Sequence, residues 1–180
     1  LYHQQKPDGS YPSIMINSID LTRMLGLIGE KQLIEVTGYL VGEVQKLVEA
    51  GADFGLFAAN TPHIVFDEIR RQVSIPLISI VEATCQEAQA LGLRRLGLFG
   101  IRFTMQGQFY SDVFSQAGIT LSLPELDEQD YIHDIYMNEL VNGIVLPKTR
   151  ERLLKIADRM KEQQNIEGVI LGGTELSLIL

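Results

Sequence analysis

The sequence is poor in cysteine, in long apolar runs and in positive charge. Its 180 residues include one cysteine, Cys85, which excludes an internal disulfide and a metal site built from several cysteines. No apolar run reaches the about 18–20 residues of a membrane-spanning helix, and no leader pattern is seen at the start. Lys and Arg number 15 against 23 Asp and Glu, a formal net charge of −8, which argues against binding nucleic-acid phosphates. We expect neither nucleic-acid nor membrane partners, and a cytoplasmic location.

The composition that is present favours a packed core. Apolar residues make up 46% of the chain and charged residues 21%, which is typical of globular proteins and not of disordered ones. A chain of 180 residues fits one domain or two small lobes.

Short apolar runs alternate with amphipathic stretches along the chain. Strands are expected at residues 13–20, 54–59, 76–81, 95–99 and 168–172. Helices are expected at residues 30–50, 62–73, 83–91, 104–117, 126–142 and 148–164. The second and the last strand lack polar alternation, which indicates burial on both faces. This order of elements predicts an α/β fold with largely parallel sheets flanked by helices.

Two phrases of the sequence resemble each other weakly. Residues 49–61 and 164–176 both run from a helix end through an acidic turn and an apolar strand to small residues, followed by Asn-Thr or Thr-Glu. The similarity favours two lobes built on one plan, which we place at residues 1–79 and 80–180. In parallel α/β sheets ligands bind beyond the carboxyl ends of the strands, so the site is expected there.

Polar residues follow the expected strand at 54–59. Asn60 and Thr61 fit two compatible roles: capping the next helix, or holding a ligand carboxylate together with that helix's N-terminus. His63 fits an acid or base, although a lone histidine in a first turn is more often a packed residue.

Two further strand ends carry similar residues. Gly100, Arg102 and Thr104 form a turn before a helix, but their spacing matches neither nucleotide-binding glycine pattern, so no nucleotide site is expected. Thr174 and Glu175 fit the first turn of a helix, which local chemistry favours for Glu175, or a ligand site. The three histidines lie far apart without metal-ligand spacing, so no metal site is expected.

Together these motifs resemble the aspartate/glutamate racemase superfamily, in its branch of aspartate and broad-specificity amino-acid racemases. AANTPH at residues 58–63 stands where the family carries Cys-Asn-Thr, and LGGTEL at 171–176 stands where it carries Gly-Cys-Thr-Glu. LFGIRFTMQGQFY at 98–110 is similar to the family's Thr-bearing loop and helix, and INSID at 16–20 to an early strand end. The four motifs follow the family's order across nearly the whole chain.

The resemblance implies two similar α/β lobes with the active site in a cleft between them. It implies a cofactor-independent racemase for aspartate, glutamate or a similar amino acid, with a small-molecule amino acid or dicarboxylate as the expected ligand, and dimers are common in the family. One cysteine thiolate of such enzymes removes the Cα proton, and a second thiol delivers a proton to the opposite face. The substrate-binding residues carried over are Asn60, Thr61, Thr104, Thr174, Glu175 and, with less certain register, Lys148.

Both cysteine positions differ in this chain. The resemblance places the first on Ala59 and the second on Gly173, whose side chains cannot carry a proton. Cys85 falls inside an expected helix and is expected to be a small packed residue. Family members begin with a glycine-rich strand before the segment resembling residues 13–20 and continue past the second motif. We therefore expect the sequence to be a piece of a longer chain.

Three hypotheses remain open. The first is an amino-acid racemase that uses another acid–base group, such as His63, Glu175, a water or a residue outside the sequence. The second is a non-catalytic relative that binds an amino acid or dicarboxylate through the retained Asn and Thr residues. The third, least favoured, is that the cysteines were exchanged to trap a ligand.

Overall fold

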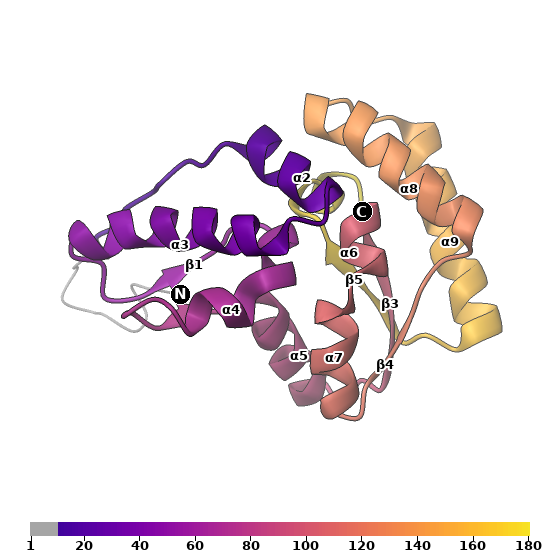
Figure 1. Ribbon diagram of the computed structural model, residues 1–180. Helices are drawn as coiled ribbons and strands as arrows, with labels where there is room; N and C mark the ends of the chain where they lie inside the picture. Colours follow the sequence, from indigo (N-terminus) through magenta and orange to yellow (C-terminus); the bar gives the residue numbers. More distant parts are fainter. Residues whose placement is uncertain (1–10) are drawn as a thin grey trace. The chain divides into compact units, whose positions relative to one another are not determined.

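The structure is a computed structural model that describes residues 11–180 (Figure 1). Its contacts divide the chain into two compact units. Unit 1 holds the described residues up to Gly55 together with Asp67–Leu77, and unit 2 holds Leu56–Phe66 and Ile78–Leu180. The boundary predicted between residues 79 and 80 stays a prediction. No helix within residues 11–180 is long and apolar enough to cross a membrane.

Unit 1 is built on two helices, α2 (Leu21–Gly29) and α3 (Leu33–Glu49). The predicted helix at 30–50 is confirmed as α3, and Gly51 follows it with a φ of 90°, the left-handed conformation that ends helices. Helix α2 was not expected from the sequence; Asp20 caps it by accepting a hydrogen bond from the Arg23 N–H at 3.0 Å. The buried positions of these helices recur at helical spacing: Met24, Ile28, Val36, Leu40 and Val44.

The strand predicted at residues 13–20 is wrong, because this segment has no regular secondary structure. Its apolar residues Ile14 and Ile16 are 74% and 87% exposed, so these side chains do not pack into a core although apolar and polar residues alternate here. The Asn17 amide donates instead to the main-chain oxygen and to the carboxylate of Glu43, at 3.1 and 2.8 Å. Alternating apolar and polar residues form a strand only where a neighbouring strand pairs with the segment and a core covers its apolar face.

Two short strands, β1 (Gly55–Leu56) and β2 (Leu77–Ile78), pair with each other. They confirm the places of the predicted strands at 54–59 and 76–81 but are shorter. Burial of β1 on both faces was wrong: Leu56 is 57% exposed, because a pair of two-residue strands offers little surface for cover. The helix predicted at 62–73 is a 3₁₀ helix, η1 (Thr61–Val65), followed by α4 (Phe66–Arg70).

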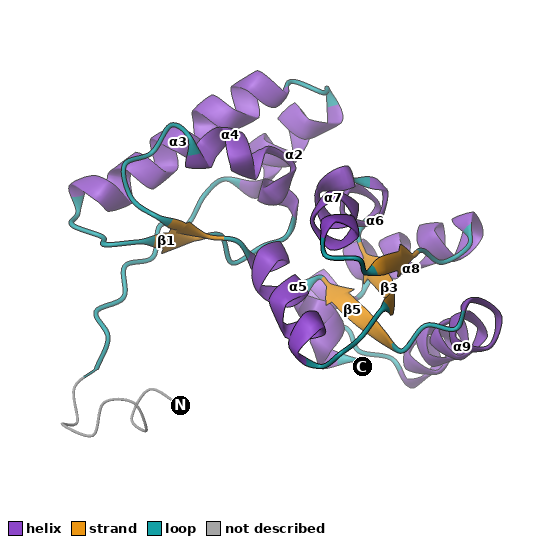
Figure 2. Cartoon of the chain, turned by 90° about the horizontal axis from the view of Figure 1, so that it is seen from below, coloured by secondary structure: helices purple, strands orange, loops and turns teal. Residues whose placement is uncertain are grey.

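Unit 2 contains a three-stranded parallel sheet in the order β4-β3-β5 (Figure 2). Its strands are β3 (Arg95–Gly100), β4 (Thr120–Ser122) and β5 (Gly168–Gly172). The register pairs Leu96 with Gly168 and Gly100 with Gly172, so β3 and β5 end level with each other. The loops that follow these two strands therefore start at the same edge of the sheet.

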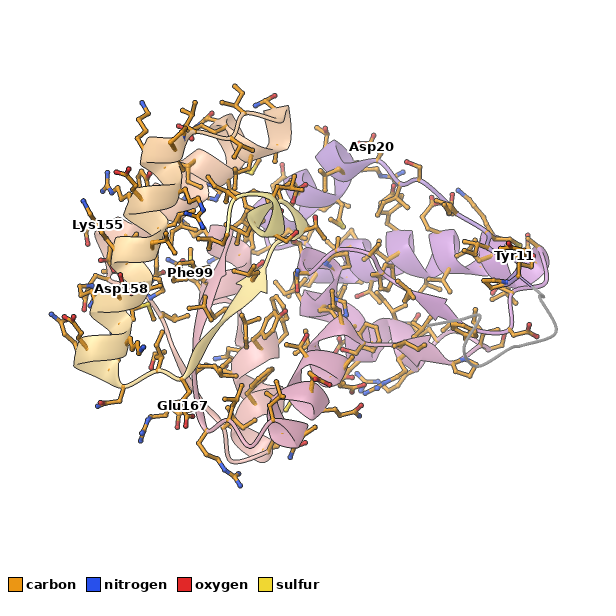
Figure 3. All side chains as sticks on the ribbon, turned by 180° about the vertical axis from the view of Figure 1, so that it is seen from behind. Tyr11, Asp20, Phe99, Lys155, Asp158 and Glu167 are labelled. Carbon is orange, nitrogen blue, oxygen red and sulfur yellow. The ribbon has the colours of Figure 1, made fainter. Side chains whose placement is uncertain are left out.

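Helices cover both faces of this sheet. Leu96 and Leu98 pack into a core with α5 (Ile80–Ala90) and α7 (Gln108–Gln116). Phe99 points to the other face and packs against α8 (Leu126–Asn138) and α9 (Pro147–Gln164). Figure 3 labels Phe99 in the interior and Lys155 and Asp158 on the exposed side of α9. The predicted α/β class with a helix-flanked parallel sheet is thus confirmed.

One predicted helix is divided in two, and another ends earlier than expected. The helix at 104–117 is divided into α6 (Arg102–Gln106) and α7, because Gly107 is extended at φ −73° and ψ 149°. A Cβ at Gly107 would lie 2.6 Å from the Phe103 oxygen, so only glycine allows this close approach. The helix at 126–142 ends as α8 at Asn138 and is followed by a 3₁₀ turn, η2 (Leu140–Asn142). Strand β4 was missed, whereas α5, α9 and β5 confirm their predictions.

Candidate functional site

The candidate site lies in unit 2, at the carboxyl ends of β3 and β5. Thr104 of α6 packs onto the paired glycines there: Cβ atoms added at Gly100 and Gly172 would lie 3.0 and 2.9 Å from its Cγ2. An added Cβ at Gly172 would also lie 2.8 Å from the Phe99 oxygen. The two glycines therefore allow a threonine to sit directly on the strand ends.

Among residues 11–180, the Thr104 hydroxyl has no hydrogen-bond partner although the residue is fully buried. Burying an unpaired hydroxyl costs about 1–3 kcal/mol. Such a group is uncommon in native proteins and is able to bond a ligand or a water that reaches it. Its position on the strand ends agrees with a binding role for this threonine.

The segment after β5 brings together Gly173, Thr174, Glu175 and a tyrosine from α8. Gly173 is buried, and a Cβ placed on it would lie 2.4 Å from Cε2 and 2.8 Å from the hydroxyl oxygen of Tyr136. The Tyr136 phenol donates a hydrogen bond to Oε2 of Glu175, and the Thr174 hydroxyl donates to the same oxygen at 2.8 Å. Thr174 is exposed and Glu175 half-buried, so this group is open to solution.

The two titratable members of this group have shifted pKa values. Burial, and then the hydrogen bond to the Glu175 carboxylate, raise the pKa of Tyr136 well above its usual range. Burial opposes ionisation of Glu175, but hydrogen bonds from Tyr136, Thr174 and its own backbone N–H outweigh it and lower its pKa. At neutral pH the proton therefore rests on the phenol, and the carboxylate is ionised.

The segment after β1 arranges its residues differently. Ala59 is exposed, whereas Asn60 and Thr61 are buried. The side chain of Asn60 does not cap η1; its Oδ1 accepts a hydrogen bond from the Tyr110 hydroxyl of α7 at 2.6 Å. Tyr110 is buried, which raises its pKa to about 12. Capping by Asn60, one of the two roles considered, is thus wrong because the amide is held from another helix.

His63 is a structural residue in this geometry. Its Nδ1–H donates to the Asn60 carbonyl at 3.1 Å, and its Nε2 accepts from the Ile80 N–H at 3.1 Å. The ring stacks on Phe66 with 4.8 Å between centroids. Burial lowers the pKa of His63 and keeps the ring neutral, so both nitrogens are occupied and neither is free for acid–base chemistry.

Three other residues considered from the sequence lie apart from this arrangement. Lys148 is exposed in the first turn of α9, and no hydrogen bond described within residues 11–180 joins it to the other candidates. Arg102 forms an exposed ion pair with Asp130 at 2.7 Å. Cys85 is packed in the core between α5 and α7, where burial raises the pKa of its thiol. Its expected role as a small packed residue is confirmed.

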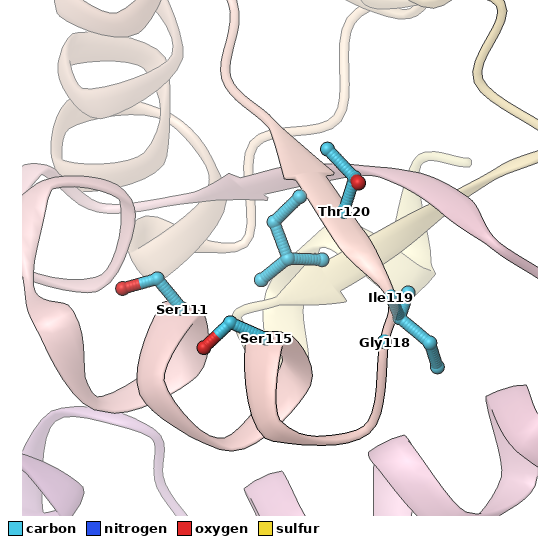
Figure 4. A pocket seen from close by; sticks show the side chains of 6 residues that line it. Ser111, Ser115, Gly118, Ile119 and Thr120 are labelled. Carbon is cyan, nitrogen blue, oxygen red and sulfur yellow. The ribbon is translucent and has the colours of Figure 1, made fainter.

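A hollow of about 400 Å³ lies elsewhere in unit 2, between α7 and β4 (Figure 4). Ser111 and Ser115 line it from the helix and Thr120 from the strand. None of the residues that line it belongs to the candidate site. Within residues 11–180, no group of three or more His, Cys, Asp or Glu side chains is arranged to hold a metal ion.

Sequence reasoning missed the two tyrosines that hold the segments after β1 and β5. Tyr110 and Tyr136 reach the segments after β1 and β5 from α7 and α8. Tyr110 ends the motif at residues 98–110 but was given no role, Tyr136 stands in no motif, and helical periodicity alone gives no partner for a phenol. The signal that was present is the missing side chain at residue 173, which leaves room for one from another element.

Comparison with known proteins gives consistent relatives. The sequence model described as Asp/Glu/hydantoin racemase matches residues 3–180. An aspartate racemase homologue from Pyrococcus horikoshii OT3 has a TM-score of 0.84 at 32% identity, over 99% of this chain and 78% of its own. A putative Asp/Glu racemase from Yersinia pestis has a TM-score of 0.87 at 27% identity, over 99% of this chain and 79% of its own. The broad specificity amino-acid racemase RacX of Bacillus subtilis (strain 168) is 25% identical over 81% of this chain, which spans 62% of that protein.

Proposed function

Because the chain belongs to the Asp/Glu/hydantoin racemase family, we propose that it exchanges the Cα proton of an amino acid and inverts its configuration without a cofactor. An acidic amino acid such as aspartate or glutamate is the proposed substrate. Two structural neighbours carry these substrates in their names, and a dicarboxylate offers two groups for hydroxyl and amide donors. A homodimer and a cytoplasmic location are further parts of the proposal.

The observation that carries the proposal is the unpartnered hydroxyl of Thr104 on the ends of β3 and β5. Thr174 and Glu175 leave the same edge of the sheet. Hydroxyl donors here suit the substrate carboxylate, and the Glu175 carboxylate suits its ammonium group. Asn60 and Thr61 are proposed as further binding residues, and Lys148 as a weaker candidate for the distal carboxylate.

The test is exchange of the Cα proton in D₂O, followed by NMR for L- and D-aspartate, L- and D-glutamate and a panel of neutral amino acids. Exchange well above the buffer rate, with appearance of the other enantiomer, is the expected result. Thr104→Val is expected to weaken substrate binding. Ser115→Ala, in the distant hollow, is the matched control and is expected to leave exchange unchanged. Calorimetric binding without exchange by any substrate would contradict the racemase and identify a non-catalytic binding protein.

A further inference from the structure

We propose that Tyr136 is a catalytic acid–base residue at the carboxyl end of β5, and that Glu175 accepts and returns its proton. This inference rests on the proposed function, because it requires that a Cα proton is exchanged at this edge of the sheet. It adds a residue from α8, outside every motif that marked the site in the sequence.

The Tyr136 phenol lies beside Gly173 at the end of β5. A Cβ at Gly173 would overlap the Tyr136 ring edge at 2.4 Å and lie 2.8 Å from its hydroxyl oxygen. The phenol thus occupies the space that a side chain of residue 173 would fill. The Tyr136 hydroxyl is therefore placed at the end of β5 much as a polar side chain of residue 173 would be.

His63 and Cys85, two other titratable groups of unit 2, are committed elsewhere. Both nitrogens of His63 are bonded to the main chain, and Cys85 lies in the core on the opposite face of the sheet from α8. The hydroxyls of Thr104 and Thr174 do not ionise in water near neutral pH. Tyr136 and Glu175 are therefore a titratable pair at the end of β5. His133 of the same helix is engaged at the end of β3, where its Nδ1 accepts a hydrogen bond from the Arg102 N–H at 3.3 Å.

A hydrogen bond joins the Tyr136 phenol to the Glu175 carboxylate. The phenol donates to a carboxylate oxygen that also accepts from Thr174 at 2.8 Å, so Glu175 is oriented before any substrate arrives. A carboxylate is able to take the phenolic proton, whereas an amide is not. The shifts already described leave the phenol protonated and the carboxylate ionised, which is the starting state for such a transfer.

The proton transfer balances without a further reactant. The Cα–H bond breaks, its proton forms a new bond to the phenolic oxygen, and the original phenolic proton moves to Oε2 of Glu175. The electron pair of the Cα–H bond stays on the substrate, delocalised into its carboxylate group. In the return step Glu175 gives its proton back as the phenol protonates Cα. For the opposite enantiomer, a water molecule protonates Cα on the other face, and the hydroxide that remains is neutralised through the solvent by the proton held on Glu175, which restores the starting state.

The experiment compares Tyr136→Phe and Glu175→Gln with Tyr131→Phe in the D₂O exchange assay. Tyr131 lies on the same helix and serves as the matched control. The Arg152 guanidinium carbon lies over the Tyr131 ring, 3.7 Å from the centre of the ring. We expect Tyr136→Phe to lower kcat for exchange by about 100-fold or more, the range of one acid–base group, while KM changes little. Glu175→Gln is expected to lower kcat and also to raise KM, because the same carboxylate is proposed to bind the substrate ammonium group. Tyr131→Phe is expected to change neither constant.

A second variant keeps the phenol but moves it. Gly173→Ala places a Cβ against the ring, so exchange is expected to fall although Tyr136 and Glu175 are both present. A wild type that exchanges, with Tyr136→Phe or Gly173→Ala at the wild-type rate, overturns this inference and leaves the proposed function intact. A folded wild type that exchanges no amino acid overturns both.

Discussion

The segments after β1 and after β5 have similar sequences but bury opposite residues. After β1 the small residue Ala59 is exposed, and Asn60, Thr61 and His63 are buried. After β5 the small residue Gly173 is buried, and the polar residues that follow it are exposed or half-buried. Both segments continue into a five-residue 3₁₀ helix, η1 or η3 (Thr174–Leu178). Similar local sequence therefore repeats the 3₁₀ helix without repeating the surroundings of the side chains.

Each segment is also held by a tyrosine from a later helix. Tyr110 donates to the Asn60 amide, and Tyr136 donates to the Glu175 carboxylate. An amide oxygen accepts a hydrogen bond but takes up no proton near neutral pH, whereas a carboxylate does. The first pair fixes a buried loop, and the second offers a path for a proton. The following predictions probe this difference.

The largest expected effect separates the two small residues. Gly173→Cys is expected to destabilise the fold by about 1–3 kcal/mol, because the new side chain must displace the Tyr136 ring and its hydrogen bond. Ala59→Cys, at an exposed position, is expected to change stability by less than about 0.5 kcal/mol. Urea unfolding of both variants measures the difference.

A double variant shows whether the ring is the cause. Gly173→Cys combined with Tyr136→Ala removes the atoms that the new side chain would meet, so it is expected to be less destabilised than the sum of its two single variants. Additive losses would mean that residue 173 is constrained by its backbone and not by Tyr136.

Much of unit 2 could be predicted from the sequence, because its signals are local. The apolar runs of β3 and β5 and the glycines after the helices, such as Gly92 and Gly118 with positive φ, mark elements without tertiary information. Strand β4 has three residues, none of them buried, so its sequence carries little strand signal. Residues 13–20 carry the alternation of a strand, and only the surroundings show that no core receives it.

The candidate site was predictable in part for the same reason. Parallel strands end at one edge, so Thr104, Thr174 and Glu175 were expected to come close, and the register of β3 and β5 starts their loops there. The contact between Tyr136 and Gly173 depends on how α8 packs on the sheet. No periodicity encodes that orientation, so the phenol could not be assigned from the sequence.

The second prediction concerns the tyrosine of the other segment. Tyr110→Phe leaves the buried Oδ1 of Asn60 without its donor and is expected to cost about 1–3 kcal/mol. Tyr136→Phe is expected to cost less stability, because the half-buried Glu175 carboxylate keeps its hydrogen bond from Thr174 and gains one from water. Thermal unfolding ranks the two variants. A larger loss of stability for Tyr136→Phe would mean that Tyr136, and not Tyr110, is the tyrosine with the main structural role.

The third prediction is a pH effect on stability that is larger in the segment after β1 than elsewhere. Burial lowers the pKa of His63, so the unfolded chain binds a proton that the folded chain resists. The stability linked to this residue is complete above the unfolded pKa of about 6.5 and is lost as pH falls toward the folded value, by at most about 1.4 kcal/mol per pH unit. His63→Gln is expected to flatten the fall in stability between pH 7.5 and 5.5, measured by urea unfolding. His133→Gln, at a half-buried histidine with the same direction of shift, is expected to flatten it less.

The smallest expected effect on stability is at the shared edge of β3 and β5. Thr104→Val replaces a buried hydroxyl that has no partner by a methyl group of similar size, so the variant is expected to match the wild type within about 1 kcal/mol or exceed it. Thr149→Val is the matched control, because the buried Thr149 hydroxyl donates to Glu139 at 2.7 Å and its loss is expected to destabilise. If Thr104→Val is as stable as the wild type but binds substrate more weakly, the hydroxyl serves the ligand and not the fold. Equal losses for both threonines would instead mean that Thr104 has a bonding partner in solution, and would remove the strongest support for a binding site on these strand ends.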